Sequence, residues 1–294
     1  MALPAYTTPG QRLWHYCYLA FCALVLFFLV APLIAVIPLS FTSSAFLSFT
    51  PEMLAFDPEA FSLRWYRLMI GDCSDPLITT VCSDKWVKGA INSLFIAVCV
   101  TLLATTLGTL ASLALSRPHM PYRKAIMAIM ISPLIVPLII TASGMFLFFA
   151  KFQLVATFTG LIMAHTVLGI PFVVITVTAT LVGFDTNLTR AAEGLGGSQL
   201  RNFFKIQLPI IAPGVISGGL FAFITSFDEV VVVLFIGSSN QMTLPRQMWA
   251  GIRQEISPTI LSVATVLVVF SIVLLTTVEL LRRRNERMRG VTPG

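Results

Sequence analysis

Long apolar stretches alternate with shorter polar ones along most of this chain. Six of the stretches contain about 20 or more mainly apolar residues, which is the length that an α-helix needs to cross a membrane. They cover approximately residues 16–39, 89–115, 126–150, 158–182, 210–236 and 258–281. The pattern therefore predicts an all-α polytopic membrane protein with six transmembrane helices.

The polar segments indicate how the chain is organised around these helices. Residues 1–88 are expected to hold an N-terminal tail, the first transmembrane helix and an outer polar loop. The first helix is too long for the apolar part of a cleaved signal peptide and has no clear cleavage site, so we expect it to be retained. Residues 89–281 are expected to form a five-helix core with a polar loop at 183–209, and residues 282–294 a basic tail.

The distribution of Lys and Arg predicts the orientation, because these residues collect on the cytoplasmic side of a membrane. With the N-terminus in the cytoplasm, twelve of the 19 Lys and Arg residues fall on that side, and the reverse topology puts most of them outside. We therefore expect a multi-pass membrane protein with both termini in the cytoplasm. The net charge of +6 then reflects topology and contact with anionic lipid, not binding to nucleic acid.

Composition argues against a soluble protein and against an enzyme. Hydrophobic residues make up 56% of the chain and charged residues 11%, whereas a soluble domain carries about 25% charged residues. The sequence has no phosphate-binding G-x-x-x-x-G-K-[ST] motif and no cluster of metal ligands, and its three histidines are far apart. We expect no catalytic residues, no metal site and no cofactor bound by this chain.

Two acidic residues, Asp228 and Glu229, lie inside the fifth apolar segment. A charged residue at membrane depth costs at least about 2.5–3.5 kcal/mol on insertion scales, so it usually faces a cavity or a partner. The functional interpretation is a site for a cation in transit. The alternative is a structural contact, either to another subunit or to backbone N–H groups.

Helix-breaking and small residues also occur inside the apolar segments. Pro133 and Pro137 fall in the third segment and Pro171 in the fourth, where each is expected to kink the helix. Gly218 and Gly219 in the fifth segment permit the close approach of another helix. These features fit a transport pathway but also occur in inert helix bundles.

The polar loop at 183–209 contains the most informative pattern. Its signature residues are Ala191, Ala192, Gly196, Ile206, Leu208 and Pro209, and Arg190 and Glu193 flank the two alanines. This spacing resembles the EAA loop of ABC importer permeases, in which Arg190 takes the place of the usual leading Glu. The resemblance implies a short cytoplasmic helix over 186–196 that docks on a separate ATPase subunit.

The local chemistry of the loop supports a short helix. Asp185 is expected to cap its start, because a carboxylate accepts the free N–H groups of a first turn. Gly196 is expected to end it in the left-handed conformation, and Ser198 to cap the following turn. Pro209 is expected to mark a bend into the next membrane helix.

Further motifs extend the resemblance over about residues 61–281. They are Ser62–Tyr66, Ser226–Val232, Leu244-Pro245 and Ile256-Ser257-Pro258. Together they resemble the second membrane subunit of spermidine/putrescine importers. The resemblance implies the MetI-like ABC importer permease fold and a substrate pathway lined by Trp65, Asp228 and Glu229.

The same resemblance implies partners and a substrate class. The partners are a second permease subunit in a heterodimer, an ATPase dimer that binds ATP and Mg²⁺, and a periplasmic substrate-binding protein. Polyamine permeases can carry an acid after the Ser132-Pro133 position, but this chain has Leu134 there. A polyamine such as spermidine or putrescine is the first expectation, and opines, aminophosphonates and other amine-bearing solutes remain alternatives.

Cys73 and Cys82 lie in the outer polar loop with a short segment between them. Because that side of a bacterial membrane is oxidising, a disulfide is expected there, with two free thiols as the alternative. Cys17, Cys22 and Cys99 fall inside apolar segments and are expected to behave as small apolar residues.

Two other classes of protein compete with a permease subunit. A stand-alone secondary transporter or channel accounts for the spans and the acids but not for the loop at 183–209, and no inverted repeat is evident. A membrane-embedded enzyme lacks a convergent nucleophile, base or metal set. Co-purification with a nucleotide-hydrolysing subunit separates the importer from both.

Overall fold

The computed structural model describes residues 7–72, 74, 83–117, 119–254 and 257–288. In these ranges the regular secondary structure is helical, apart from one isolated β-bridge between Thr42 and Phe61. Cys73 and Cys82 lie outside the described residues, so their disulfide stays a prediction. Five of the described helices are long and apolar enough to cross a membrane, and a bent helix pair makes six if it counts as one span.

Contacts divide the chain into two compact units. The first contains residues 1–82 and 251–283, and the second contains residues 83–250 and 284–294. The last long helix, α13 (Pro258–Met288), thus begins in the unit that contains the N-terminal residues. It also runs past the predicted end at residue 281.

The first unit contains α1 (Pro9–Leu39), α2 (Pro51–Leu54), α3 (Arg64–Met69) and most of α13. Polar contacts fix the chain where α1 ends. The hydroxyl of Ser262 in α13 donates to the carbonyl oxygen of Ser40 at 3.1 Å, and the Ser40 hydroxyl lies 2.7 Å from that of Tyr66 in α3. Both α3 and α13 are therefore joined to the chain immediately after α1.

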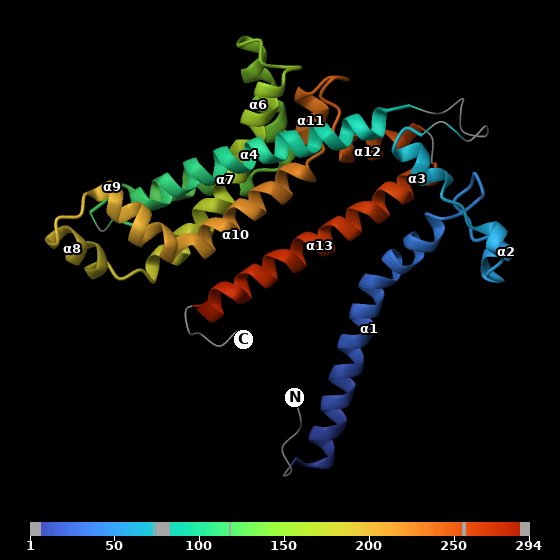
Figure 1. Cartoon of the computed structure of the whole chain (residues 1–294), viewed down its shortest axis with the longest axis horizontal. Coiled ribbons are helices and arrows are strands. Elements are labelled where there is room, and N and C mark those ends of the chain that lie inside the picture. Colours follow the sequence, from blue (N-terminus) through green and yellow to red (C-terminus); the bar gives the residue numbers. More distant parts are fainter. Residues whose placement is uncertain (1–6, 73, 75–82, 118, 255–256, 289–294) are drawn as a thin grey trace. The chain divides into compact units, whose positions relative to one another are not determined.

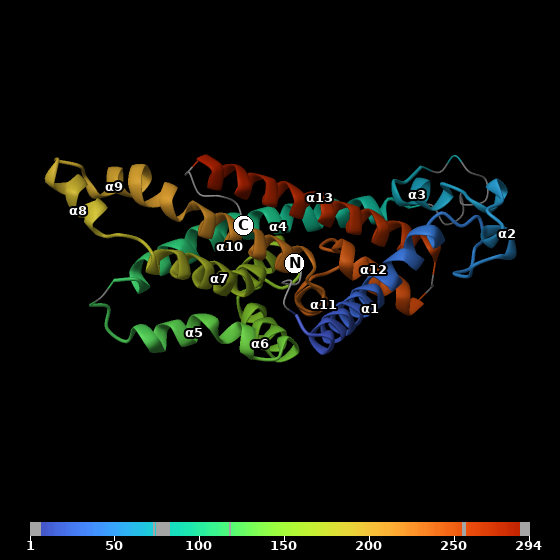
Figure 2. The same ribbon diagram turned by 90° about the horizontal axis from the view of Figure 1, so that it is seen from below.

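Three long helices form the centre of the second unit: α4 (Lys85–Leu115), α7 (Phe158–Val182) and α10 (Leu208–Phe227). They lie side by side in both views (Figure 1 and Figure 2) and pack through small residues. A Cβ atom on Gly169 of α7 would stand 3.2 Å from the Cβ of Ala222 and 3.3 Å from that of Ala104. This close approach joins all three helices at one level.

The third predicted span is interrupted. It consists of α5 (Arg123–Ile135) and α6 (Leu138–Lys151), whose axes differ by 104°. Val136 between them is extended with ψ 133°, because the ring of a following proline, here Pro137, disfavours helical backbone. Helix α6 then packs against α11 (Val231–Ile236), and Phe149, Val232 and Val233 are buried there.

The fifth predicted span, 210–236, is also interrupted, so a single helix over that range was wrong. Helix α10 ends at Phe227 and α11 begins at Val231. The apolar residues of α11 extended the sequence pattern beyond the real end of the long helix. The interruption contains Asp228 and Glu229, and the short helix α12 (Leu244–Gln254) follows further along the chain.

Candidate functional site

The two acidic residues at the interruption have different surroundings. Asp228 follows the last residue of α10, and its side chain is exposed and has no hydrogen bond or ion pair to the residues that the structure describes. Glu229 is buried with 7% of its surface exposed, and its Oε1 accepts a hydrogen bond from the backbone N–H of Val232 at 2.8 Å. Glu229 is therefore hydrogen-bonded to a backbone N–H group, which is one of the structural alternatives expected for the acidic pair.

Helix ends explain why neighbouring acids take different roles. The carbonyl end of a helix carries partial negative charge and its N–H end partial positive charge. Asp228 stands at the carbonyl end of the 20-residue helix α10, so the helix adds to its negative charge. Glu229 stands at the N–H end of α11, where a backbone donor offsets its charge. Asp228 is thus the acid of the two whose charge no hydrogen bond from a described residue offsets.

A buried histidine lies beside the end of α10. His165 of α7 is 1% exposed, and its Nδ1 lies 3.0 Å from the hydroxyl oxygen of Ser226. Its Nε2 has no hydrogen-bond partner among the described residues. This pair was missed from the sequence, in which the three histidines are far apart, since nothing in a single sequence links two residues at such a distance.

Trp65, the third residue expected in the pathway, belongs to the first unit. It is 8% exposed, packs with Leu68, and donates its indole N–H to the carbonyl oxygen of Thr42 at 2.8 Å. The indole N–H is therefore used within that unit. The acids belong to the second unit, and a pathway role for Trp65 stays a prediction.

The polar loop forms the short helix that its sequence predicts. Helix α8 spans Asn187–Gly194, and its N-cap position is Thr186, one residue after the expected Asp185, with no side-chain cap hydrogen bond. Asp185 Oδ1 still accepts the N–H of Asn187, the first residue of the helix, at 2.9 Å. Gly196 ends the segment with φ +82°, in the left-handed region that glycine adopts at low cost. Ser198 caps the next short helix, α9 (Gln199–Asn202), by accepting the N–H of Arg201 at 3.4 Å.

Helix α8 and the residue that follows it present apolar side chains that are largely exposed among the described residues. Leu188 is 45% exposed and Leu195 is 90% exposed, and the side chains of Arg190 and Glu193 are exposed as well. Of the two signature alanines, Ala191 is exposed and Ala192 is half-buried. The predicted coupling segment is therefore available to another protein.

The end of the motif differs from the expected bend. A π-helical turn, Phe203–Gln207, contains Ile206, and α10 begins directly after it at Leu208. Pro209 is near the start of α10, and because the π-turn leads directly into α10, helical backbone continues through it. The irregular point is thus the π-turn before Pro209.

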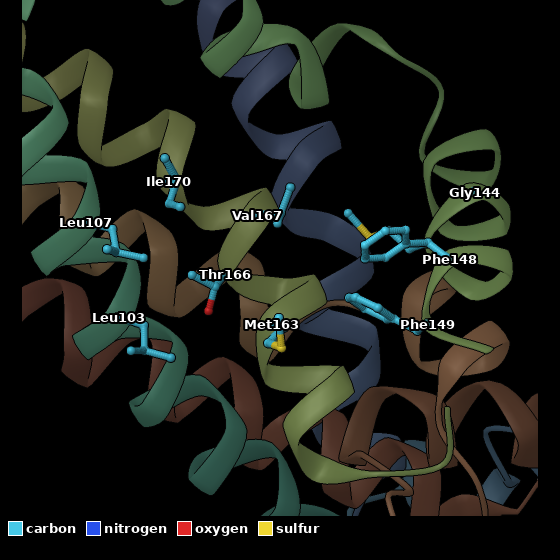
Figure 3. A pocket seen from close by; sticks show the side chains of 10 residues that line it. Leu103, Leu107, Gly144, Phe148, Phe149, Met163, Thr166, Val167 and Ile170 are labelled. Carbon is cyan, nitrogen blue, oxygen red and sulfur yellow. The ribbon is translucent and has the colours of Figure 1, made fainter. Parts of the chain in front are cut away.

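An apolar cavity of about 540 Å³ lies between α4, α6 and α7 (Figure 3). Phe148 and Phe149 approach from α6, Met163 from α7 and Leu103 from α4. The cavity has no charged lining residue, so its chemistry differs from that at Asp228. Sequence reasoning missed it because its α6 wall depends on the bend at Pro137.

The family comparison identifies the class of protein to which this arrangement belongs. Residues 104–288 match the family described as binding-protein-dependent transport system inner membrane component. The chain belongs to this family. It is a membrane permease of an ABC importer and not an enzyme, and ATP hydrolysis takes place on a separate ATPase subunit. Such a permease works with a partner permease, an ATPase and a substrate-binding protein.

Curated relatives share most of the chain. The spermidine/putrescine transport system permease protein PotC of Escherichia coli K12 is 29% identical over 265 residues, covering 90% of this chain and 92% of that protein. PotC of Haemophilus influenzae is 28% identical over 239 residues, covering 81% and 89%. The putrescine transport system permease protein PotI of E. coli K12 is 29% identical over 247 residues, covering 82% and 81%.

Solved structures confirm the fold. A chain of a bacterial ABC transporter that imports the acidic polysaccharide alginate aligns with a TM-score of 0.67 at 14% identity, over 96% of this chain and 99% of that one. A chain of the MetNI methionine ABC transporter aligns with a TM-score of 0.52 at 21% identity, over 75% and 100%. The predicted MetI-like all-α fold is therefore correct.

Proposed function

We propose that this chain forms half of the membrane pathway of a polyamine importer, with spermidine or putrescine as substrate. The observation that carries the proposal is the exposed, unpaired Asp228 at the carbonyl end of α10. The names of the curated relatives, PotC and PotI, point to the same substrates. A permease for polycations needs uncompensated negative charge along its path, and Asp228 supplies it.

Electrostatics favours a cation over a neutral solute at this position. A carboxylate beside membrane-spanning helices has lost part of its hydration, and an ammonium group restores favourable charge interactions. The carbonyl end of α10 adds to this attraction, as helix ends do in transporters that bind cations. Glu229 contributes less to the charge at this point because the N–H of Val232 holds it.

Opines, aminophosphonates and other amine-bearing solutes form the second candidate class. The observation behind it is Leu134, which stands where polyamine permeases can carry an acid and is 41% exposed in α5. With one acid fewer, the path offers less charge to a di- or trication. A monocationic amine requires only Asp228.

The partners follow from the location of the exposed elements. The surface of α8 contacts the ATPase, which binds ATP and Mg²⁺, and Arg190 pairs with an acid on that subunit. The second permease subunit is a paralogue of this chain. Both termini lie in the cytoplasm, so the binding protein delivers substrate from the opposite side of the inner membrane.

The test is uptake by the complete transporter. The chain is produced with its neighbouring transporter genes in a bacterium that lacks polyamine uptake, and entry of labelled spermidine and putrescine is measured. Saturable, ATP-dependent uptake that excess unlabelled opine or aminophosphonate leaves unchanged supports the proposal. Uptake of labelled opine or aminophosphonate with no polyamine uptake overturns it in favour of the second class.

A further inference from the structure

His165 and Ser226 connect the middle of α7 to the last turn of α10. Both residues are buried, at 1% and 5% exposure, and His165 Nδ1 lies 3.0 Å from Ser226 Oγ. One helical turn away along both helices, Gly169 faces Ala222 at short range. The His165–Ser226 pair therefore stands at the next level of the same tight α7–α10 contact, and Ser226 is two residues before Asp228.

The position of Ser226 determines where Asp228 points. Residues two apart on an α-helix differ in direction by about 200°, so they project from nearly opposite sides. Ser226 faces inward to α7 and Asp228 is exposed, as this geometry requires. A rotation of the last turn that released Ser226 from the interior would carry Asp228 toward it.

We propose that His165 is a positioning residue that acts through Ser226 to hold Asp228 on the exposed side of the interruption. The inference rests on the proposed role of Asp228 as the acid of the substrate pathway. His165 itself does not touch the substrate. Its contribution is to fix the rotation of the last turn of α10.

A hydrogen bond fixes the rotation of the last turn of α10 better than apolar packing does. The residues next to His165 belong to a core of aliphatic and aromatic side chains, including Ala164 and Leu168, which sets no unique rotation of a helix end. A hydrogen bond is directional, and breaking it inside the core leaves two buried polar atoms unpaired. Because Nε2 has no partner among the described residues, Ser226 provides the only hydrogen bond found there for the imidazole ring.

The test measures the exposure of position 228 in the complete transporter. The five native cysteines are replaced, Asp228→Cys is introduced, and its reaction rate with a positively charged methanethiosulfonate reagent is recorded in membranes. We expect His165→Leu and Ser226→Ala each to lower the rate about tenfold, the factor that corresponds to one buried hydrogen bond. His165→Asn, whose amide occupies the place of Nδ1, should keep most of the rate.

Thr178→Val is the matched control, since it removes another buried polar group of α7, several turns along that helix from His165. Its labelling rate should equal that of the parent, which carries Asp228→Cys without a further substitution in α7 or α10. Equal rates in the His165→Leu, His165→Asn and parent proteins overturn the inference. Ser226→Ala decides the question if His165→Leu does not reach the membrane, because it breaks the same hydrogen bond with a smaller change in shape.

Uptake by the transporter that retains Asp at position 228 provides a second, independent test. His165→Leu should raise the half-saturating concentration of putrescine about tenfold at equal membrane abundance, and it should have no further effect in an Asp228→Asn background. Additive effects of the two substitutions overturn the inference. If the parent takes up no polyamine but the labelling rates differ as expected, the polyamine proposal fails and the positioning role of His165 stands.

Discussion

Glu229 stabilises the first turn of the helix that begins at Val231 by accepting the backbone N–H of Val232 at 2.8 Å, while the adjacent Asp228 remains exposed. Asp228 and Glu229 are thus adjacent in the sequence, but their side chains lie in different surroundings. Glu229 stabilises the start of α11, and Asp228 is the acid that we propose for a cationic substrate. This separation makes the two residues distinguishable by substitution.

Replacement of Glu229 should affect stability more than transport. Glu229→Ala removes the acceptor and should cost about 0.5–2 kcal/mol of stability, as loss of a helix cap does. Glu229→Gln keeps an acceptor oxygen and should retain most of that stability and of the uptake. Thermal unfolding in detergent and membrane abundance measure the first effect. If Glu229→Gln abolishes uptake at equal abundance, Glu229 belongs to the pathway as well.

Replacement of Gly196 should uncouple the ATPase from transport. With φ at +82°, a β-branched residue such as Val is strained at this position, by about 1–2 kcal/mol, although a Cβ atom meets nothing within 4 Å. Gly196→Val should therefore shift the end of α8 and lower uptake while ATP hydrolysis continues. Insertion into the membrane should be normal.

The control for that variant is Gly194→Ala. Gly194 is the last residue of α8, has no positive φ, and its added Cβ atom also meets nothing within 4 Å. Uptake and ATPase binding should stay at parental levels. If ATP hydrolysis and uptake remain coupled in Gly196→Val, the assignment of α8 as the ATPase contact is wrong.

Features encoded by neighbouring residues could be predicted from the sequence. The hydrogen bond from Asn187 N–H to Asp185, the left-handed Gly196 and the cap at Ser198 each depend on backbone groups within three residues. The long apolar helices follow from composition and length in the same way. Such local features need no knowledge of how the helices pack.

Features that depend on distant contacts could not be predicted. The indole of Trp65 bonds to Thr42, and His165 bonds to Ser226 across 61 positions of sequence. The apolar run after Glu229 gave no sign that α10 ends at Phe227, because a buried helix of six residues and a longer span look alike in composition. A kink at Pro137 was expected, but its size of 104° also reflects packing of α6 on α11.

Replacement of Gly218 should destabilise the three-helix centre. A Cβ atom there would overlap the Thr176 hydroxyl and stand 2.8 Å from the Cα of Val173, a backbone atom that cannot move alone. Gly218→Ala should cost about 1–3 kcal/mol, the usual effect of overpacking, and should lower membrane abundance. Gly144→Ala serves as the control, because its Cβ atom meets nothing within 4 Å. Equal abundance of the two variants would contradict the tight α7–α10 contact.

Replacement of Asp228 should affect transport without affecting the amount of protein. Asp228→Asn keeps the size and shape of an exposed side chain that makes no hydrogen bond or ion pair to the described residues, so abundance and unfolding temperature should change little. It removes the negative charge at the end of α10, and uptake of spermidine and putrescine should fall at least about tenfold, which corresponds to about 1.4 kcal/mol of lost interaction. Asp228→Glu, which keeps the charge, should retain part of the uptake. The measurement is initial uptake rate at matched membrane abundance, and unchanged uptake by Asp228→Asn would remove the reason to assign a cationic substrate to this permease.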